Sequence, residues 1–273
     1  QSDLLTLAEC DHYEDFWRER LRGAGYSSVW RKRPRSSSPD GCTIAWRNAT
    51  FELIAQGGVD FANSLEAQAA GQLDRTLLLA LLRFKRNPSQ RVLVATTHLA
   101  RNPECRQQTL PRGYQYGLLF RELLAFASAH DAVDAPVVIT GDLNAKCIDE
   151  LSELSKGVAA VCGGMDKAHP VLWSVRDAPT SATTRTEMRC MRIDYLLYQT
   201  SKLVLRGVGK IPLLDTPMPN ADHPSDHAPV TATFLFKSQY AELEESARTL
   251  TSISTRADRC MRVRFKLTRR TVA

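Results

Sequence analysis

Residues 136–144 read PVVITGDLN, and this stretch decides the fold class of the chain. The apolar run 136–140 has the length and the β-branched content of a buried strand. It runs directly into Gly141, Asp142 and Asn144, where polar residues follow the apolar ones. A carboxylate at the end of a buried strand is costly unless it is paired or binds a metal ion. The stretch therefore predicts a strand that places a functional carboxylate at the edge of a sheet.

Seven further apolar runs of strand length flank this stretch. They occupy residues 4–9, 42–46, 51–55, 77–84, 92–98, 193–198 and 230–236. A short polar segment with Asn87 and Pro88 separates the runs 77–84 and 92–98, which predicts an antiparallel pair. The runs 42–46 and 51–55 are predicted to be strands on either side of a turn. The chain is thus predicted to be rich in strands along most of its length.

Two segments with helical spacing complete the pattern. Asp11 and Glu14 have the spacing of a capping box, before a helix that ends near Gly23. In the segment 114–130, Leu119 and Leu123 lie on one predicted helix face. Strands outnumber helices, and no glycine-rich phosphate loop follows any strand. The pattern predicts an α/β protein whose strands pack as a two-layer β-sandwich with helices outside, rather than a doubly wound parallel sheet.

The composition is that of a globular chain with a full core. Of the 273 residues, 43% are hydrophobic and 24% are charged, and the formal net charge is +6. No apolar run approaches the roughly 18 residues of a membrane helix, so we expect no membrane partner. The seven cysteines are scattered without a CxxC pair. This disfavours a disulfide framework and a zinc ribbon, and it predicts an intracellular location, cytoplasmic or mitochondrial.

Positive charge concentrates toward the C-terminal end. Residues 237–273 contain nine Lys or Arg and four Asp or Glu, and so hold +5 of the total charge. We predict a catalytic domain over residues 1–236 and a basic extension over 237–273. Within the extension, Arg262, Arg264 and Lys266 alternate with apolar residues, as in a strand with one basic face. Two interpretations stay open: an edge strand protected by charge, or a strip that faces RNA or docks on a partner.

A second basic run, residues 31–39, contains prolines and serines and predicts a solvated loop.

Polar side chains stand at the ends of the predicted strands, where a core strand disfavours them. They are Glu9, His98, Asp142, Asn144, Asp194, Asp226 and His227. Taken singly, each is more often an ordinary polar residue: GDLN alone is compatible with a turn, and SDH alone with a helix cap. Four carboxylates, two histidines and one asparagine in equivalent positions are better explained by a metal site. Oxygen ligands without clustered thiolates point to Mg²⁺, with Mn²⁺ as the alternative, rather than to zinc.

The order and context of these residues resemble a known superfamily. The motifs are LAECD at 7–11, TTHL at 96–99, GDLN at 141–144, RIDY at 192–195 and SDH at 225–227. Together they resemble the endonuclease/exonuclease/phosphatase superfamily, which has the fold of deoxyribonuclease I. The DGC stretch at 40–42, the NP pair at 102–103 and the HP pair at 223–224 are similar to one branch. That branch is the carbon-catabolite-repressor-type poly(A) deadenylases, with nocturnin and Angel relatives.

The resemblance implies a four-layer fold, with the two-layer β-sandwich enclosed by helices. It also implies a first strand before residue 4, carrying an Asn of the metal site, and the given sequence lacks this strand. By the same resemblance, Glu9 and Asp226 bind the catalytic metal. We therefore expect a sandwich without its first strand and with these two carboxylates at the metal.

The resemblance also implies roles for the remaining polar residues. Asp142 aligns or deprotonates the attacking water, and Asn144 holds the scissile phosphate. His227, oriented by Asp194, stabilises the transition state or acts as general base. His98 binds the phosphate or assists the departing oxygen. These roles match the needs of phosphodiester hydrolysis, which are charge neutralisation, an activated water and help for the leaving group.

The substrate slot is expected beside these residues. Pro103 matches one side of the base slot of the deadenylases, whose other side carries an aromatic residue. Residues 187–191 have no aromatic at that place, but Arg189 can stack on a base. The expected function is that of a Mg²⁺-dependent phosphodiesterase, a 3′–5′ exoribonuclease or deadenylase acting on single-stranded RNA 3′ ends or poly(A).

The alternative is a non-catalytic or moonlighting member of the family. Such a protein is a subunit or assembly factor of a large ribonucleoprotein, held through the basic extension. A lipid-phosphate substrate, used by other proteins of this fold, is disfavoured because their Trp- and Arg-rich signatures are missing from the last two motifs.

Overall fold

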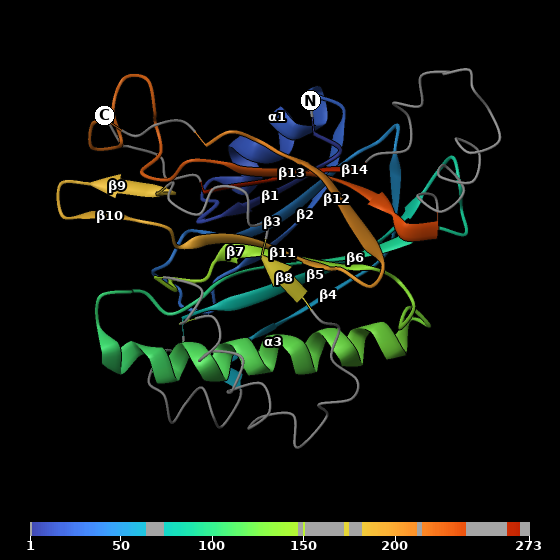
Figure 1. The fold of residues 1–273 in the computed structure, drawn as a ribbon, viewed down its shortest axis with the longest axis horizontal. Coiled ribbons are helices and arrows are strands. Elements are labelled where there is room, and N and C mark those ends of the chain that lie inside the picture. Colours follow the sequence, from blue (N-terminus) through green and yellow to red (C-terminus); the bar gives the residue numbers. More distant parts are fainter. Residues whose placement is uncertain are drawn as a thin grey trace.

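The structure is a computed structural model, and it describes residues 2–63, 74–146, 150, 172–174, 182–211, 215–238 and 261–267. The described strands form two six-stranded sheets and one short hairpin. The first sheet has the order β12-β13-β14-β1-β3-β2, and the second has the order β4-β5-β6-β7-β11-β8. Figure 1 shows the two sheets stacked face to face. The predicted β-sandwich is therefore confirmed.

The strands have the following bounds. The first sheet contains β1 (Leu4–Ala8), β2 (Tyr26–Lys32), β3 (Gly41–Arg47), β12 (Leu203–Val208), β13 (Val230–Phe236) and β14 (Met261–Leu267). The second contains β4 (Phe51–Asp60), β5 (Thr76–Phe84), β6 (Arg91–His98), β7 (Val137–Asp142), β8 (Leu172–Ser174) and β11 (Asp194–Gln199). The hairpin consists of β9 (Thr184–Thr186) and β10 (Arg189–Met191).

Helices cover the outer faces of both sheets (Figure 1). The π-helix η1 (Tyr13–Trp17) continues into α1 (Arg18–Gly23) over the first sheet, and α3 (Thr109–Ala129) lies along the second sheet. Short 3₁₀ turns are η2 (Phe61–Asn63) and η3 (Arg106–Gln108). The arrangement gives the four layers that the motifs implied. Among the described residues, no helix combines the length and the apolar character needed to cross a membrane.

The strand β5 shows why the second sheet is buried on both faces. Its alternate residues Leu78, Ala80 and Leu82 belong to the core between the two sheets. The intervening Leu77, Leu79 and Leu81 belong to the core under α3. Successive strand residues point to opposite faces, so a strand covered on both sides must be apolar at every position. This accounts for the uninterrupted apolar run in the sequence.

The register of the second sheet aligns the polar strand ends. β6 and β7 are parallel, with His98 opposite Asp142, and β7 and β11 are antiparallel, with Asp142 opposite Asp194. β5 and β6 form the predicted antiparallel pair. Gly141 allows β7 to approach β6 closely, because a Cβ at this position would lie 2.1 Å from the Thr97 carbonyl oxygen. Three functional side chains therefore meet at one end of the sheet.

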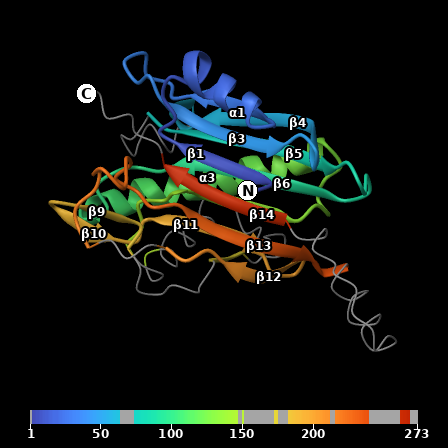
Figure 2. The same ribbon diagram turned by 90° about the horizontal axis from the view of Figure 1, so that it is seen from above.

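The strand β14 corrects one interpretation of the basic extension. β14 pairs in parallel with β1 and in antiparallel with β13, so it lies inside the first sheet (Figure 2). The interpretation as an edge strand is therefore wrong. β14 covers the side of β1 that faces away from β3. Residues 239–260 and 268–273 of the predicted extension lie outside the described residues.

One local prediction differs from the structure. Asp11 and Glu14 form no capping box: His12 precedes η1, and no side chain caps this helix. The local sequence pattern was compatible with two geometries, and the structure adopts the other one. The strands predicted on either side of a turn are confirmed: β3 and β4 are separated by a turn at residues 48–50, and they belong to different sheets.

Candidate active site

The predicted site residues gather at one end of the sandwich. Glu9 directly follows β1, His98 and Asp142 end β6 and β7, and Asp194 begins β11. The segment with Asp226 and His227 precedes β13. Strands of both sheets therefore contribute, and the residues come from distant parts of the chain. The prediction that these polar residues share one place agrees with the topology.

Asp194 and His227 form a buried pair. The His227 Nδ1 lies 2.7 Å from Asp194 Oδ2, and both side chains are almost completely buried. The Thr183 hydroxyl accepts hydrogen bonds from the backbone N–H groups of Ile193 and Asp194, which fixes the start of β11. Burial lowers the pKa of His227, but the Asp194 charge and hydrogen bond outweigh it and raise this pKa to about 9. The pair thus favours a protonated imidazole at neutral pH.

Asp142 lies beside this pair and is buried. Its Oδ1 accepts a hydrogen bond of 2.8 Å from the backbone N–H of Asn144. Burial, followed by the negative charge of Asp194, raises the pKa of Asp142 to about 7. The Asn144 amide donates to the Leu99 carbonyl oxygen at 3.3 Å, so Asn144 is held between the ends of β6 and β7. A carboxyl group with a pKa near neutrality suits a group that exchanges protons with water.

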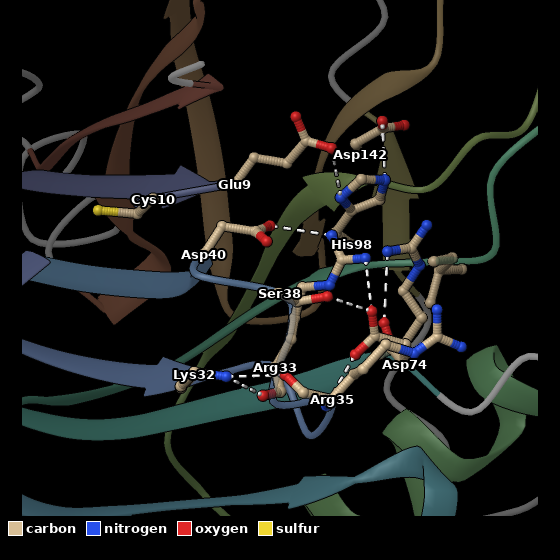
Figure 3. Close-up of polar contacts among 12 residues, drawn as sticks. Glu9, Cys10, Lys32, Arg33, Arg35, Ser38, Asp40, Asp74, His98 and Asp142 are labelled. Carbon is tan, nitrogen blue, oxygen red and sulfur yellow. Dashed lines mark hydrogen bonds and ion pairs between the residues drawn. The ribbon is translucent and has the colours of Figure 1, made fainter. Parts of the chain in front are cut away.

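Glu9, after β1 of the first sheet, faces His98, at the end of β6 of the second sheet. His98 lies between two carboxylates, with Nδ1 3.6 Å from Glu9 Oε1 and Nε2 3.4 Å from Asp142 Oδ2 (Figure 3). Glu9 has a left-handed backbone, with φ of 49°. This conformation is unfavourable for a residue with a side chain and is often kept where it aims a functional group. Its carboxylate reaches the second sheet across the sandwich.

The site presents oxygen ligands that fit a hard divalent cation. Ligand atoms of Asp142, Asp194 and His227 all lie within 4.8 Å of one another. Asp194 Oδ1 and Asp226 Oδ1 are buried without a hydrogen-bond partner among the described residues. Buried carboxylate oxygens left unpaired are costly, and a bound cation removes that cost. The metal site predicted from the sequence therefore has suitable donors, whereas ligation by Glu9 and Asp226 in particular stays a prediction.

The comparisons with known proteins agree with this geometry. The model of the Endonuclease/Exonuclease/phosphatase family matches residues 1–227. The chain belongs to this family. It is 24% identical over 278 residues to the carbon catabolite repressor protein 4 homolog 4 of Arabidopsis thaliana, with 86% of this chain and 67% of the relative covered. The family and the enzyme class predicted from the motifs, hydrolases that act on phosphodiester bonds, are confirmed.

Two further proteins show a similar degree of identity. The Ccr4 subunit of Kluyveromyces lactis, a CCR4-Not complex 3′-5′-exoribonuclease subunit, is 24% identical over 85% of this chain. The chain spans only 35% of the length of that relative. The structure of ANGEL2, a 2′,3′-cyclic phosphatase, superposes with a TM-score of 0.69 at 24% identity, covering 85% of this chain and 81% of ANGEL2. This likeness shows that the four-layer fold is shared.

The two residues predicted to form the base slot, Pro103 and Arg189, are connected through Glu104. The side chain of Arg189, in β10, donates to Glu104 Oε1 at 2.6 Å and to Oε2 at 3.1 Å. Glu104 directly follows Pro103, which is buried. Lys146 donates to the Glu104 backbone carbonyl at 3.3 Å. The hairpin that carries Arg189 is therefore tied to the loop that carries Pro103.

The start of α3 supports this loop. The Gln115 side chain is buried, and its Oε1 accepts a hydrogen bond of 2.8 Å from the backbone N–H of Ala100. Arg112 is fully buried and donates to the carbonyl oxygens of Ala100 and Asn102. Sequence reasoning missed Arg112, since an arginine in an amphipathic helix is usually exposed. Its burial is explained by the loop that returns over α3 and by its ion pair with Glu150.

The prediction of a solvated loop at residues 31–39 is wrong for Arg33. Arg33 is mostly buried, and its two terminal nitrogens each lie 2.9 Å from a carboxylate, one from Asp40 and one from Asp74. Residues Arg31 and Lys32 belong to β2 rather than to a loop. Figure 3 shows Arg33, Asp40 and Asp74 next to His98. The loop is therefore anchored against the active site by ion pairs.

Proposed function

We propose that the chain is a Mg²⁺-dependent phosphodiesterase, and specifically a 3′–5′ exoribonuclease that acts on single-stranded 3′ ends or poly(A). The observation that carries the proposal is the buried group of Asp142, Asp194 and His227. Among the described residues, the Oδ1 atoms of Asp194 and of Asp226 are buried without a hydrogen-bond partner. Mn²⁺ is the alternative cation. When bound, the cation supplies charge neutralisation and a polarised phosphate oxygen.

The side chains divide the work of hydrolysis among them. Asp142 aligns the attacking water and accepts its proton, for which a pKa near 7 is suitable. The water oxygen forms a bond to phosphorus as the bond from phosphorus to the 3′ oxygen breaks. His227, held protonated by Asp194, donates a hydrogen bond to the charge that develops on the phosphate. Asn144 holds the phosphate, and His98 assists the departing oxygen. Glu9 and Asp226 are the proposed cation ligands.

Single-stranded RNA is the substrate class favoured by the slot at Pro103. The bidentate pair with Glu104 uses the Nε and one terminal nitrogen of Arg189. The flat face of the guanidinium group then remains for stacking on a base opposite Pro103. Stacking tolerates every base, so adenine preference needs further contacts. We propose that the protein acts on RNA and does so inside the cell.

A second candidate function rests on the basic extension. Residues 237–273 hold a net charge of +5, and β14 anchors this segment inside the first sheet. A segment that is joined to the first sheet through β14 and is rich in Lys and Arg suits salt-sensitive attachment to a ribonucleoprotein. In this role the protein is a subunit or assembly factor that binds RNA without needing the active site.

The experiment follows a 5′-labelled RNA with a 3′ run of adenosines, and a second RNA of mixed sequence. We expect Mg²⁺-dependent shortening from the 3′ end that stops with EDTA and in the Asp142→Ala and Glu9→Ala variants. The matched control is Asp3→Asn, because Asp3 pairs with Arg47 at the opposite end of β1. Cleavage that persists in Asp142→Ala contradicts the proposed mechanism. Binding without cleavage of either RNA, unchanged in both variants, supports the second candidate.

A further inference from the structure

A narrow pocket lies beside the catalytic side chains, and a buried arginine lines it. Its lining residues are Glu9, Arg33, Asp40, Gly41, Cys42, Arg75, Thr76 and His98. Arg75 is 4% exposed and comes directly before β5. Neither the catalytic roles nor the base slot described above uses this arginine. Its position calls for an explanation because a buried guanidinium group is costly without partners.

Arg75 has few partners for a buried cation. Its Nη1 donates to the backbone carbonyl of Asp74 at 3.3 Å. Its Nε is buried and has no hydrogen-bond partner in the part of the chain that the structure describes. Nor is any described carboxylate in ion-pair contact with it. A guanidinium group carries five N–H donors, so most of the donors of Arg75 remain available to a ligand.

The carboxylate of the neighbouring Asp74 forms no ion pair with Arg75 and is already bound by other groups. Asp74 accepts hydrogen bonds from Arg33 Nη2 at 2.9 Å, from the Arg35 backbone N–H at 3.0 Å and from Ser38 Oγ at 2.6 Å (Figure 3). These partners lower the pKa of Asp74 below its usual value, against the effect of its partial burial. Asp74 is therefore an anchor for the chain just before Arg75.

The backbone on the other side of Arg75 is also fixed. The Arg75 carbonyl accepts a hydrogen bond of 3.0 Å from the Phe61 N–H. The next residue, Thr76, begins β5, and its carbonyl accepts a hydrogen bond of 2.9 Å from the Thr97 hydroxyl. Thr97 immediately precedes His98. The cationic group is thus held in place before any ligand binds, which is the condition for strong electrostatic stabilisation.

The sheet register places Arg75 in line with the reacting groups. Leu77 pairs with Thr97, so Arg75 lies just beyond the level of His98 at the end of the sheet. His98 in turn pairs with Asp142. Burial, followed by the positive charge of Arg33, lowers the pKa of Arg75 to about 10, and the negative charges of Glu9, Asp142 and Asp74 act against this. The row of functional groups at the strand ends therefore continues from Asp142 through His98 to Arg75.

We infer that Arg75 is an anion-binding residue of the active site, whose guanidinium group binds a non-bridging oxygen of the substrate phosphate. The planar fork of an arginine matches two phosphate oxygens, and lysine does not reproduce this geometry. The inference rests on the proposed function only for the identity of the substrate, a nucleotide phosphate. It adds a fixed positive charge to the chain's own catalytic groups.

The test measures ligand binding rather than turnover. The probes are adenosine 5′-monophosphate and inorganic phosphate, titrated calorimetrically in EDTA, with adenosine as the ligand that lacks a phosphate. We expect Arg75→Gln to weaken binding of both phosphates about tenfold to a hundredfold, as for a lost hydrogen bond to a charged group. Arg75→Lys should recover only part of this loss. Adenosine binding should not change.

The control is Arg83→Gln, because Arg83 lies at the other end of β5 and pairs with Glu52 at 2.6 Å. It should leave phosphate binding unchanged. Equal phosphate binding by Arg75→Gln and the wild type overturns the inference, and so does an equal loss of phosphate and adenosine binding. The Arg75 Nε–H signal in NMR spectra of the wild type provides a test without any variant. Its failure to shift on addition of phosphate overturns the inference as well.

These outcomes separate the inference from the proposed function. A chain that binds phosphate through Arg75 but hydrolyses no RNA keeps the inference and refutes the nuclease. A chain that hydrolyses RNA but binds phosphate equally well in Arg75→Gln does the reverse.

Discussion

Replacing Asp194 by Asn tests the central pair of the active site. The variant keeps the size of the side chain but removes the charge that lies 2.7 Å from His227 Nδ1. Both side chains are buried, so neither water nor salt replaces the lost interaction effectively. The change should therefore act mainly on the protonation of His227 and on the catalytic step that needs it.

The pKa of His227 sets the size of the effect. It is raised from 6.5 to about 9 in the folded protein. This difference corresponds to about 3 kcal/mol of preference for the protonated imidazole, at about 1.4 kcal/mol for each tenfold change. Because the folded pKa is raised, the stabilisation is fully present below about pH 6.5 and is lost as the pH rises through 9. Without Asp194, burial lowers the pKa of His227 and only the weaker effects of Asp142 and Asp226 oppose it, so the pKa should fall well below 9.

The assay is an NMR titration of the His227 ring in EDTA, with urea unfolding at several pH values. We expect Asp194→Asn to lower the pKa of His227 by at least two units, with a loss of about 3 kcal/mol of stability at low pH. Hydrolysis should fall about a hundredfold or more. The Asp3→Asn variant, which removes a carboxylate at the opposite end of β1, should leave the His227 titration as it is. A pKa of His227 near 9 in Asp194→Asn refutes the reasoning.

Three further predictions follow from the same geometry. The pKa of Asp142 is raised from 3.8 to about 7, so its ionised form destabilises the metal-free protein as the pH rises through 7. Binding of Mg²⁺, measured by calorimetry, should therefore strengthen from about pH 6 to about pH 8, and the Asp142→Asn variant should lose this dependence. Gly141→Ala should cost about 1–3 kcal/mol in urea unfolding, because the new Cβ would lie 2.1 Å from the Thr97 carbonyl oxygen. Gly113→Ala, whose Cβ meets nothing within 4 Å in α3, should cost nothing. Leu79→Ala should cost about 2–5 kcal/mol by thermal unfolding, since Leu79 is 1% exposed in the core under α3.

The strands that the sequence predicted best are those with both faces buried. The runs 77–84 and 92–98 correspond to β5 and β6 nearly residue for residue. Their central residues, 77–82 and 92–95, are all apolar, as expected for strands covered on both faces, so the pattern is contained within each segment. The predicted start of the first helix failed, because a capping box depends on a local geometry that η1 does not adopt. The edge position of residues 261–267 failed because sheet order is not a local property.

The sequence by itself determined which chemical groups stand at the strand ends. Apolar runs that stop at Glu9, His98 and Asp142, or begin at Asp194, carry this information locally, since burial disfavours a polar group inside a strand. The resemblance to the family followed from the order of these short motifs along the chain. Neither conclusion required knowledge of which segments meet in space.

The tertiary structure decided most of the partners of these groups. The resemblance implied the pair of Asp194 and His227, but the sequence did not predict that Arg33 meets Asp74 across 41 residues of chain or that Glu104 meets Arg189 across 85. These contacts depend on sheet order and register, which result from the packing of all four layers together. The pocket beside Arg75 belongs to the same class of information. An arginine before a strand is ordinary in sequence, and only the structure shows that Arg75 is buried in a pocket with Glu9 and His98.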